Sequence, residues 1–237
     1  MPPTMGVTTV LRSWLSPLLD LVYPPRCAGC GRPGAWFCPA CQAEAAPLPL
    51  TRCPACGSPA GERGGPCYRC RHPGSPLNGI FATAIFEPPI RPAIHRFKYG
   101  GLSVLAGPLA GRLGDTWLAA GLPGDLIVPV PLHPGREAER GYNQAVLLAT
   151  ALGVRLGLPT AADLLVRARP TASQTTLKIH ERHANVAGAF ACRGRADGQR
   201  VLLVDDVCTT GATMEACAEA LRNAGAAAVW GLAVARA

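Results

Sequence analysis

The sequence predicts an α/β protein in which a mostly parallel sheet, with helices on both faces, follows a small cysteine-rich domain. Eight of the eleven cysteines lie in C-x-x-C pairs between residues 27 and 70. By contrast, residues 77–237 alternate between strand-like and helix-like segments, which is typical of a parallel sheet. The chain is 49% apolar and 16% charged, so its 237 residues can form one ordinary compact domain and a small second one.

Residues 1–25 are expected to form an N-terminal helix that ends at Pro24 and Pro25. Arg12, Pro17 and Asp20 interrupt its apolar run, which therefore falls short of the ~18–20 residues that a membrane span requires. A basic n-region and a small-residue cleavage site are also missing. We therefore expect no membrane span and a cytoplasmic protein.

Residues 26–76 form a region rich in Cys, Gly and Pro, with almost no hydrophobic periodicity. Such a region cannot bury a core of its own, so it must be stabilised by other means, such as a bound metal. Two C-x-x-C pairs can complete one tetrahedral four-thiolate site, and four pairs complete two. Because the protein fills all four positions, the sites are expected to hold two structural Zn²⁺ ions. Gly31 and Gly57 follow cysteines at turns that often need a positive φ. The expected ligands are Cys27, Cys30, Cys38, Cys41, Cys53, Cys56, Cys67 and Cys70.

Other arrangements of these cysteines stay open at this point. The spacing does not forbid an iron–sulfur cluster, and disulfides are disfavoured only by the expected reducing compartment. Sequential pairs can share one ion, or the first pair can join the third in a cross-braced arrangement. The other three cysteines, Cys192, Cys208 and Cys217, are scattered.

Residues 77–237 contain the segments expected to build the sheet and its helices. The run VLLV is nearly all apolar, as in a strand buried on both faces, and Gly225 is expected to end the last helix. The expected strands are Ile80–Phe86, Leu126–Val130, Leu164–Val166, Val201–Val204 and Ala228–Ala235. The expected helices are Ile90–Phe97, Leu102–Ala119, Asn143–Leu156 and Thr213–Asn223.

A phosphate-binding loop is predicted directly after VLLV, where a strand of a parallel sheet ends and ligands bind. Hydroxyl and backbone N–H groups precede a helix N-terminus, which favours a phosphate dianion, and Gly211 allows close approach. Asp205 and Asp206 can accept hydrogen bonds from vicinal ribose hydroxyls, so the predicted ligand is a ribose 5-phosphate. The candidate residues are Asp205, Asp206, Val207, Cys208, Thr209, Thr210, Gly211, Ala212 and Thr213.

Two other interpretations fit the acidic strand end. A Walker B segment also ends in acids, but the chain contains no G-x-x-x-x-G-K-[ST] motif, and its only lysines, Lys98 and Lys178, lie outside glycine loops. Alternatively, the acids could simply end a strand, with Thr213 capping the next helix.

Basic residues precede this loop. Arg136 and Arg140 lie four apart before Asn143, which starts a helix, and the arginine fork suits pyrophosphate, although Glu137 or Glu139 could pair with them instead. Lys98 and Tyr99 either line the mouth of the site or lie on a solvated helix face.

The segment VLLVDDVCTTGAT (201–213) closely resembles the 5-phosphoribosyl 1-pyrophosphate (PRPP) motif of type I phosphoribosyltransferases. Together with the cysteine pairs, three further segments in order resemble the ComF family of competence-associated proteins, over nearly the whole chain. These segments are HRFKYGG (95–101), VPVPLHPGREAERGYNQA (128–145) and LLVRARPTASQTTLKIHERHANVAGAF (164–190).

The resemblance implies a double zinc ribbon joined to a phosphoribosyltransferase domain over 77–237. It implies that residues 205–213 bind ribose and its 5′-phosphate with Mg²⁺, and that Asp205 and Asp206 are the catalytic residues of an active enzyme. It places His133, Arg136, Arg140 and Asn143 near pyrophosphate, and Arg167, Arg169, Gln174 and Arg182 in a mobile loop that closes over the site. Cys208, where the family more often has an aliphatic residue or Thr, is expected to be a small buried hydrophobe.

Two functions remain in view. As an enzyme, the protein would transfer a phosphoribosyl group from PRPP, but no base-recognition hood is visible in the sequence. As a non-catalytic module, it would sense a nucleotide or PRPP, while its zinc ribbons and net charge of +8 contact single-stranded DNA or a competence helicase-type partner. The family implies a role in DNA uptake or in the use of imported DNA. Trp36, Phe37 and Tyr68 either stack on bases or pack in a small core.

Overall fold

The computed structural model describes residues 24–237 except 46–47, 57, 62–64, 170–185 and 187. The helix expected within residues 1–25 and the turn expected at Gly57 therefore lie outside the described residues.

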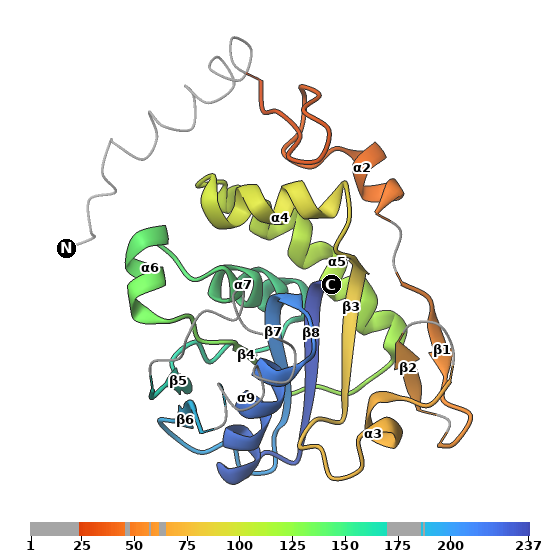
Figure 1. Ribbon diagram of the computed structural model, residues 1–237, viewed down its shortest axis with the longest axis vertical. Coiled ribbons are helices and arrows are strands. Elements are labelled where there is room, and N and C mark those ends of the chain that lie inside the picture. Colours follow the sequence, from red (N-terminus) through yellow and green to blue (C-terminus); the bar gives the residue numbers. More distant parts are fainter. Residues whose placement is uncertain (1–23, 46–47, 57, 62–64, 170–185, 187) are drawn as a thin grey trace, which may run out of the picture.

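A four-stranded, fully parallel sheet forms the centre of the fold (Figure 1). Its order is β3 (Gly79–Ile85), β8 (Ala228–Arg236), β7 (Arg200–Cys208) and β4 (Leu126–Pro129). The register places Val201 of β7 beside Leu126 of β4 and Val229 of β8. Because all four strands are parallel, their carboxyl ends meet at one edge, as predicted for a ligand site.

Helices cover both faces of this sheet, which confirms the predicted fold class. Along β7, Leu202 and Val204 pack in one core cluster, and Val201 and Leu203 pack in another. The first cluster contains α4 (Ile90–Tyr99), α5 (Ala106–Ala120) and α7 (Gln144–Leu156), with a 3₁₀ turn at Ser103–Leu105 before α5. The second contains α9 (Ala212–Asn223), after which the chain turns at Gly225 with φ +98°.

Two expectations about secondary structure need correction. The expected strand Leu164–Val166 does not join the main sheet; β5 (Leu165–Arg167) instead pairs antiparallel with β6 (Phe190–Cys192). An additional helix, α6 (Pro134–Arg140), was not predicted, because it buries no residue and therefore has no apolar periodicity.

The cysteine-rich region packs on the sheet domain and contains short elements. These are α2 (Pro39–Glu44), the antiparallel pair β1 (Leu50–Arg52) and β2 (Pro59–Gly61), and α3 (Tyr68–Arg71). Phe37 lies in the same core cluster as α4 and α5. Arg112 of α5 donates a 2.9 Å hydrogen bond to the Gln42 carbonyl oxygen. In the described part of the chain, no helix combines the length and apolarity needed to cross a bilayer.

Candidate ligand-binding and metal sites

A cavity of about 710 Å³ opens at the carboxyl edge of the sheet. The last turn of α4, the segment from β4 through the first residue of α7, the end of β7 and the first turn of α9 surround it. Sequence-predicted residues that line it are Lys98, Tyr99, His133, Arg136, Arg140, Asn143, Arg167, Asp205, Asp206, Val207, Cys208, Thr209, Gly211, Ala212 and Thr213.

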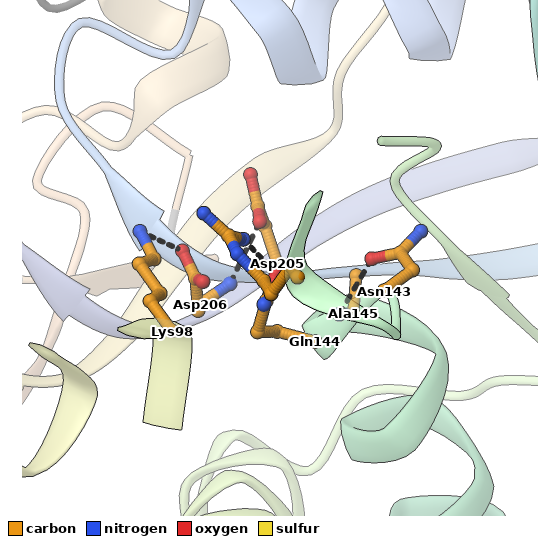
Figure 2. A network of polar contacts seen from close by, with 7 residues as sticks. Lys98, Asn143, Gln144, Ala145, Asp205 and Asp206 are labelled. Carbon is orange, nitrogen blue, oxygen red and sulfur yellow. Dashed lines mark hydrogen bonds and ion pairs between the residues drawn. The ribbon is translucent and has the colours of Figure 1, made fainter. Parts of the chain in front are cut away.

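Two acidic side chains and a lysine meet inside this cavity. Lys98 Nζ lies 2.7 Å from Asp206 Oδ1, and Figure 2 shows the two side chains pointing toward one another from α4 and β7. The Asp206 backbone N–H donates a 2.8 Å hydrogen bond to Asp205 Oδ1. The Lys98 side chain is only 22% exposed, so Lys98 does not lie on a solvated helix face.

The acidic pair has strongly perturbed electrostatics. Burial, followed by the negative charge of Asp206, raises the pKa of Asp205 from 3.8 to about 7. Burial alone lowers the pKa of Lys98, but the carboxylates of Asp206 and Asp205 outweigh it, so this pKa lies above its usual value. Lys98 is therefore a cation held against the acids, and Asp205 changes charge near neutral pH.

The raised pKa of Asp205 predicts a pH dependence of stability. A carboxyl group whose pKa is higher in the folded state stabilises the fold fully below about pH 4 and loses this contribution as pH rises to about 7. Between pH 4 and 7 the unfolding free energy of the wild type should therefore fall relative to that of Asp205→Asn, which does not titrate there. Above pH 7 the difference between the two proteins should stay constant. A carboxyl ¹³C titration should give a midpoint near 7, and a midpoint near 4 would contradict the described environment.

The predicted phosphate loop is shorter than the sequence suggested, because β7 continues through Asp205 and Asp206 to Cys208. Only residues 209–211 connect it to α9. Gly211 has φ +91°, a backbone conformation that favours glycine, and a Cβ there would also displace Ile80 Cδ1, which would lie 2.9 Å away. Thr210 is not among the residues that line the cavity; its Oγ1 accepts a 3.3 Å hydrogen bond from the Ala212 N–H.

Cys208 is 3% exposed at the end of β7. This burial agrees with the expectation that a small hydrophobe occupies this position.

The polar residues after β4 line the cavity from α6 and the start of α7. Arg140 donates to Gln144 Oε1, and its guanidinium carbon lies 5.0 Å from the centre of the Tyr99 ring. His133 Nδ1 accepts a 3.1 Å hydrogen bond from the Gly135 N–H at the start of α6. Asn143 caps α7 by accepting from the Ala145 N–H at 2.9 Å (Figure 2). Asn143 Nδ2 also donates a 3.1 Å hydrogen bond to the Val130 carbonyl oxygen, so Asn143 and His133 fix the two ends of the segment that carries the arginines.

The segment expected to close over the site is described only at its start. Arg167 lines the cavity, and its guanidinium carbon lies 5.5 Å from the centre of the Phe190 ring. Burial, followed by the positive charge of Arg136, lowers the pKa of Arg167. Arg169 is exposed and is not among the residues that line the cavity, whereas Gln174 and Arg182 lie outside the described residues.

Gln144 is a cavity residue that the sequence analysis missed. It is 2% exposed, and its Nε2 has no hydrogen-bond partner within the described residues. A polar residue directly after a helix cap is ordinarily exposed, and only its place before the apolar run AVLLA could have indicated burial. Phe86 and His95 also line the cavity and were not predicted.

The eight paired cysteines form two clusters of four. Cys27, Cys30, Cys38 and Cys41 form one, Cys53, Cys56, Cys67 and Cys70 form the other, and the sulfur atoms of each lie within 4.8 Å of one another. This sequential grouping decides against the cross-braced alternative. Tetrahedral Zn²⁺ with Zn–S bonds of about 2.3 Å separates its sulfurs by about 3.8 Å. The Sγ atoms of Cys30 and Cys38 lie 3.7 Å apart, so the donors fit structural Zn²⁺.

In the second cluster the backbone favours the thiolate of one ligand, Cys53, whereas hydrogen bonds with the Cys56 and Cys67 thiols raise the pKa of Cys70 to about 12. Hydrogen bonds from the N–H groups of Cys67, Ala55 and Cys56 lower the pKa of Cys53 to about 6. Because Zn²⁺ binds the thiolate, a lowered pKa favours metal binding at neutral pH.

Comparison with known families defines the class of protein. Residues 18–71 match the model of the double zinc ribbon domain, and residues 141–235 match that of the phosphoribosyl transferase domain. The chain is therefore a double zinc ribbon joined to a phosphoribosyltransferase domain.

Relatives specify the family. The chain is 36% identical to DNA utilization protein YhgH of Salmonella typhi, over 88% of this chain and 96% of the relative. It is 32% identical to competence protein F of Haemophilus influenzae, over 83% of this chain and 90% of the relative. The protein belongs to the ComF family. Glutamine PRPP amidotransferase from B. subtilis has a TM-score of 0.38 and 22% identity, over 55% of this chain and 26% of that chain.

Proposed function

We propose that this protein binds a 5-phosphoribosyl compound, PRPP or ribose 5-phosphate, at the carboxyl edge of its sheet. One observation carries the proposal: the acidic pair near the end of β7 and the N-terminus of α9 face the same cavity, with only residues 207–211 between them in the chain. Acceptors for ribose hydroxyls thus lie next to donors for a phosphate. The cavity volume of about 710 Å³ falls within the usual range for small-molecule sites.

Each part of the cavity has a distinct role in this proposal. Asp205 and Asp206 accept hydrogen bonds from the ribose hydroxyls, and the 5′-phosphate is held by the cavity-lining residues Thr209, Gly211, Ala212 and Thr213. Arg136 and Arg140 face the pyrophosphate of PRPP, where their planar guanidinium groups can donate in pairs. Carboxylate oxygens are donors that Mg²⁺ accepts, so the acidic pair also fits that ion, which would neutralise pyrophosphate charge. Lys98 supplies a fixed positive charge beside the acids before ligand arrives.

Phosphoribosyl transfer is the reaction that this arrangement supports if the protein is an enzyme. Cations around a leaving pyrophosphate would stabilise the negative charge that develops as the C1–oxygen bond of PRPP breaks. The purified protein should therefore be incubated with Mg²⁺, labelled PRPP and a panel of bases and nucleotides, with pyrophosphate release as the readout. Turnover that disappears in an Asp205→Ala/Asp206→Ala double variant supports the enzyme, and PRPP binding without turnover supports a sensor or scaffold.

The names of the relatives suggest the cellular process. Competence protein F and DNA utilization protein YhgH are named for competence and for DNA use, and we infer a role in DNA uptake or in the use of imported DNA. A second candidate function, contact with single-stranded DNA or a helicase-type partner, is favoured by Trp36, which is 37% exposed on the first ribbon. Phe37 and Tyr68 are buried and serve in the core instead. DNA binding would weaken steeply with salt, and Trp36→Ala should reduce it.

A further inference from the structure

The second zinc ribbon contacts the phosphoribosyltransferase domain next to the phosphate loop. Its short helix α3 begins directly after Cys67 and contains Cys70. Two of the four cysteines of the second site therefore anchor this helix. Tyr68, in its first position, is 6% exposed and packs in the core cluster that contains α9. Tyr68 therefore belongs to the zinc ribbon by sequence and to the sheet domain by packing.

A pair of hydroxyl groups from this region holds one carboxylate on α9. The Tyr68 hydroxyl donates a 2.7 Å hydrogen bond to Glu215 Oε1, and the Ser75 hydroxyl donates to the same oxygen at 3.0 Å. Glu215 lies in the first turn of α9 and is not among the residues that line the cavity. The two donors thus hold a negative charge away from the proposed phosphate position.

Tyr68 also lies directly behind the loop itself. The Glu215 backbone N–H donates a 2.9 Å hydrogen bond to the Gly211 carbonyl oxygen. A Cβ placed on Gly211 would lie 2.9 Å from Ile80 Cδ1 and 3.5 Å from the Tyr68 hydroxyl oxygen. Ile80 and Tyr68 therefore pack directly against the loop and the start of α9.

We propose that Tyr68 is a positioning residue through which zinc at the second four-cysteine site holds the phosphate loop in its binding conformation. The proposal rests on the proposed function insofar as it concerns ligand affinity. A helix of four residues has no stability of its own, and Cys67 before α3 and Cys70 within it tie this helix to the metal site. Loss of that zinc releases Tyr68, which removes the packing contact behind Gly211 and one of the donors that hold the Glu215 carboxylate. Because coupling between two binding sites is reciprocal, bound ligand also raises the zinc affinity of the second four-cysteine site by the same factor.

The test compares Tyr68→Phe with the wild type and with Thr51→Val. Tyr68→Phe keeps the ring and all cysteines but removes the donor to Glu215. Thr51→Val also removes one hydroxyl from the second ribbon, where Thr51 Oγ1 donates to the Ala60 carbonyl oxygen at 3.2 Å without touching α9. Four readouts apply to each protein: zinc content, hydrogen exchange of residues 209–215 without ligand, affinity for ribose 5-phosphate, and zinc affinity measured by competition with a chelator with and without ribose 5-phosphate.

In Tyr68→Phe we expect two zinc ions per chain, exchange at residues 209–215 that is about 5-fold faster or more, and a similar loss of ribose 5-phosphate affinity. Ribose 5-phosphate should also raise the zinc affinity of Tyr68→Phe less than that of the wild type. Thr51→Val should match the wild type in all four measurements. Exchange in Tyr68→Phe that equals the wild type overturns the positioning role. Wild-type protein that binds no ribose 5-phosphate contradicts the proposed function, and the exchange measurement then still decides whether Tyr68 positions the loop.

Discussion

Replacing Asp206 by Asn should weaken binding of ribose 5-phosphate about 10- to 150-fold. The reason is that a hydrogen bond to a charged group contributes about 1.5–3 kcal/mol, and Asn keeps the side-chain volume while removing the charge. Asp206 is 4% exposed and lies 2.7 Å from Lys98, so little solvent can replace the lost interaction. Titration calorimetry of both proteins at constant ionic strength measures the change.

A comparison of ligands separates hydroxyl recognition from overall charge. The wild type should bind ribose 5-phosphate more tightly than 2-deoxyribose 5-phosphate, and in Asp206→Asn this preference should fall toward one. Asp163→Asn, which removes the same charge at an exposed residue that does not line the cavity, should keep the wild-type preference. An undiminished preference in Asp206→Asn would show that the acidic pair does not hold the ribose.

Replacing Cys41 by Ser should remove one zinc and lower the unfolding free energy by about 4 kcal/mol or more, the range expected for loss of a structural metal. Cys41 is one of four donors in the first cluster and is 2% exposed. It also belongs to the core cluster that contains Phe97 and Leu109, so loss of the metal disturbs packing on α4 and α5. Metal analysis and thermal denaturation measure the two effects.

The matched control is Cys192→Ser, which changes a half-buried thiol outside both clusters. It should retain two zinc ions per chain and a melting temperature near that of the wild type. Cys41→Ser protein that still holds two zinc ions would rule out the first four-cysteine site.

The parallel sheet was predictable because its strands carry apolar runs such as VLLV, which are typical of strands buried on both faces, and alternate with helical segments. β5 was assigned to the sheet for the same reason, but a three-residue run does not reveal its partner. β5 pairs antiparallel with Phe190–Cys192, whose residues lie at least 23 positions further along the chain. Only the tertiary fold brings these two strands together. α6 has no buried face, so its sequence carries no apolar periodicity that would predict a helix.

The acidic pair and the loop were visible in the sequence because both belong to one short segment. The position at which β7 ends could not be predicted. Two adjacent acids, Asp205 and Asp206, resemble the end of a strand, but the backbone pairing continues to Cys208. Long-range contacts were also hidden. Nothing in the sequence joins Lys98 to Asp206 or Tyr68 to Glu215, because each pair meets only after α4 and α3 have packed.

The central claim, that residues 205–213 bind a phosphoribosyl group, is tested most directly by mapping amide chemical shifts during titration with Mg²⁺ and PRPP. We expect saturable shifts concentrated at Asp205–Thr213, with smaller ones near Lys98 and Arg140. Ribose 5-phosphate should reproduce the shifts at Thr209–Thr213. Absence of saturable binding by both ligands, or shifts confined to residues away from this cavity, would contradict the account.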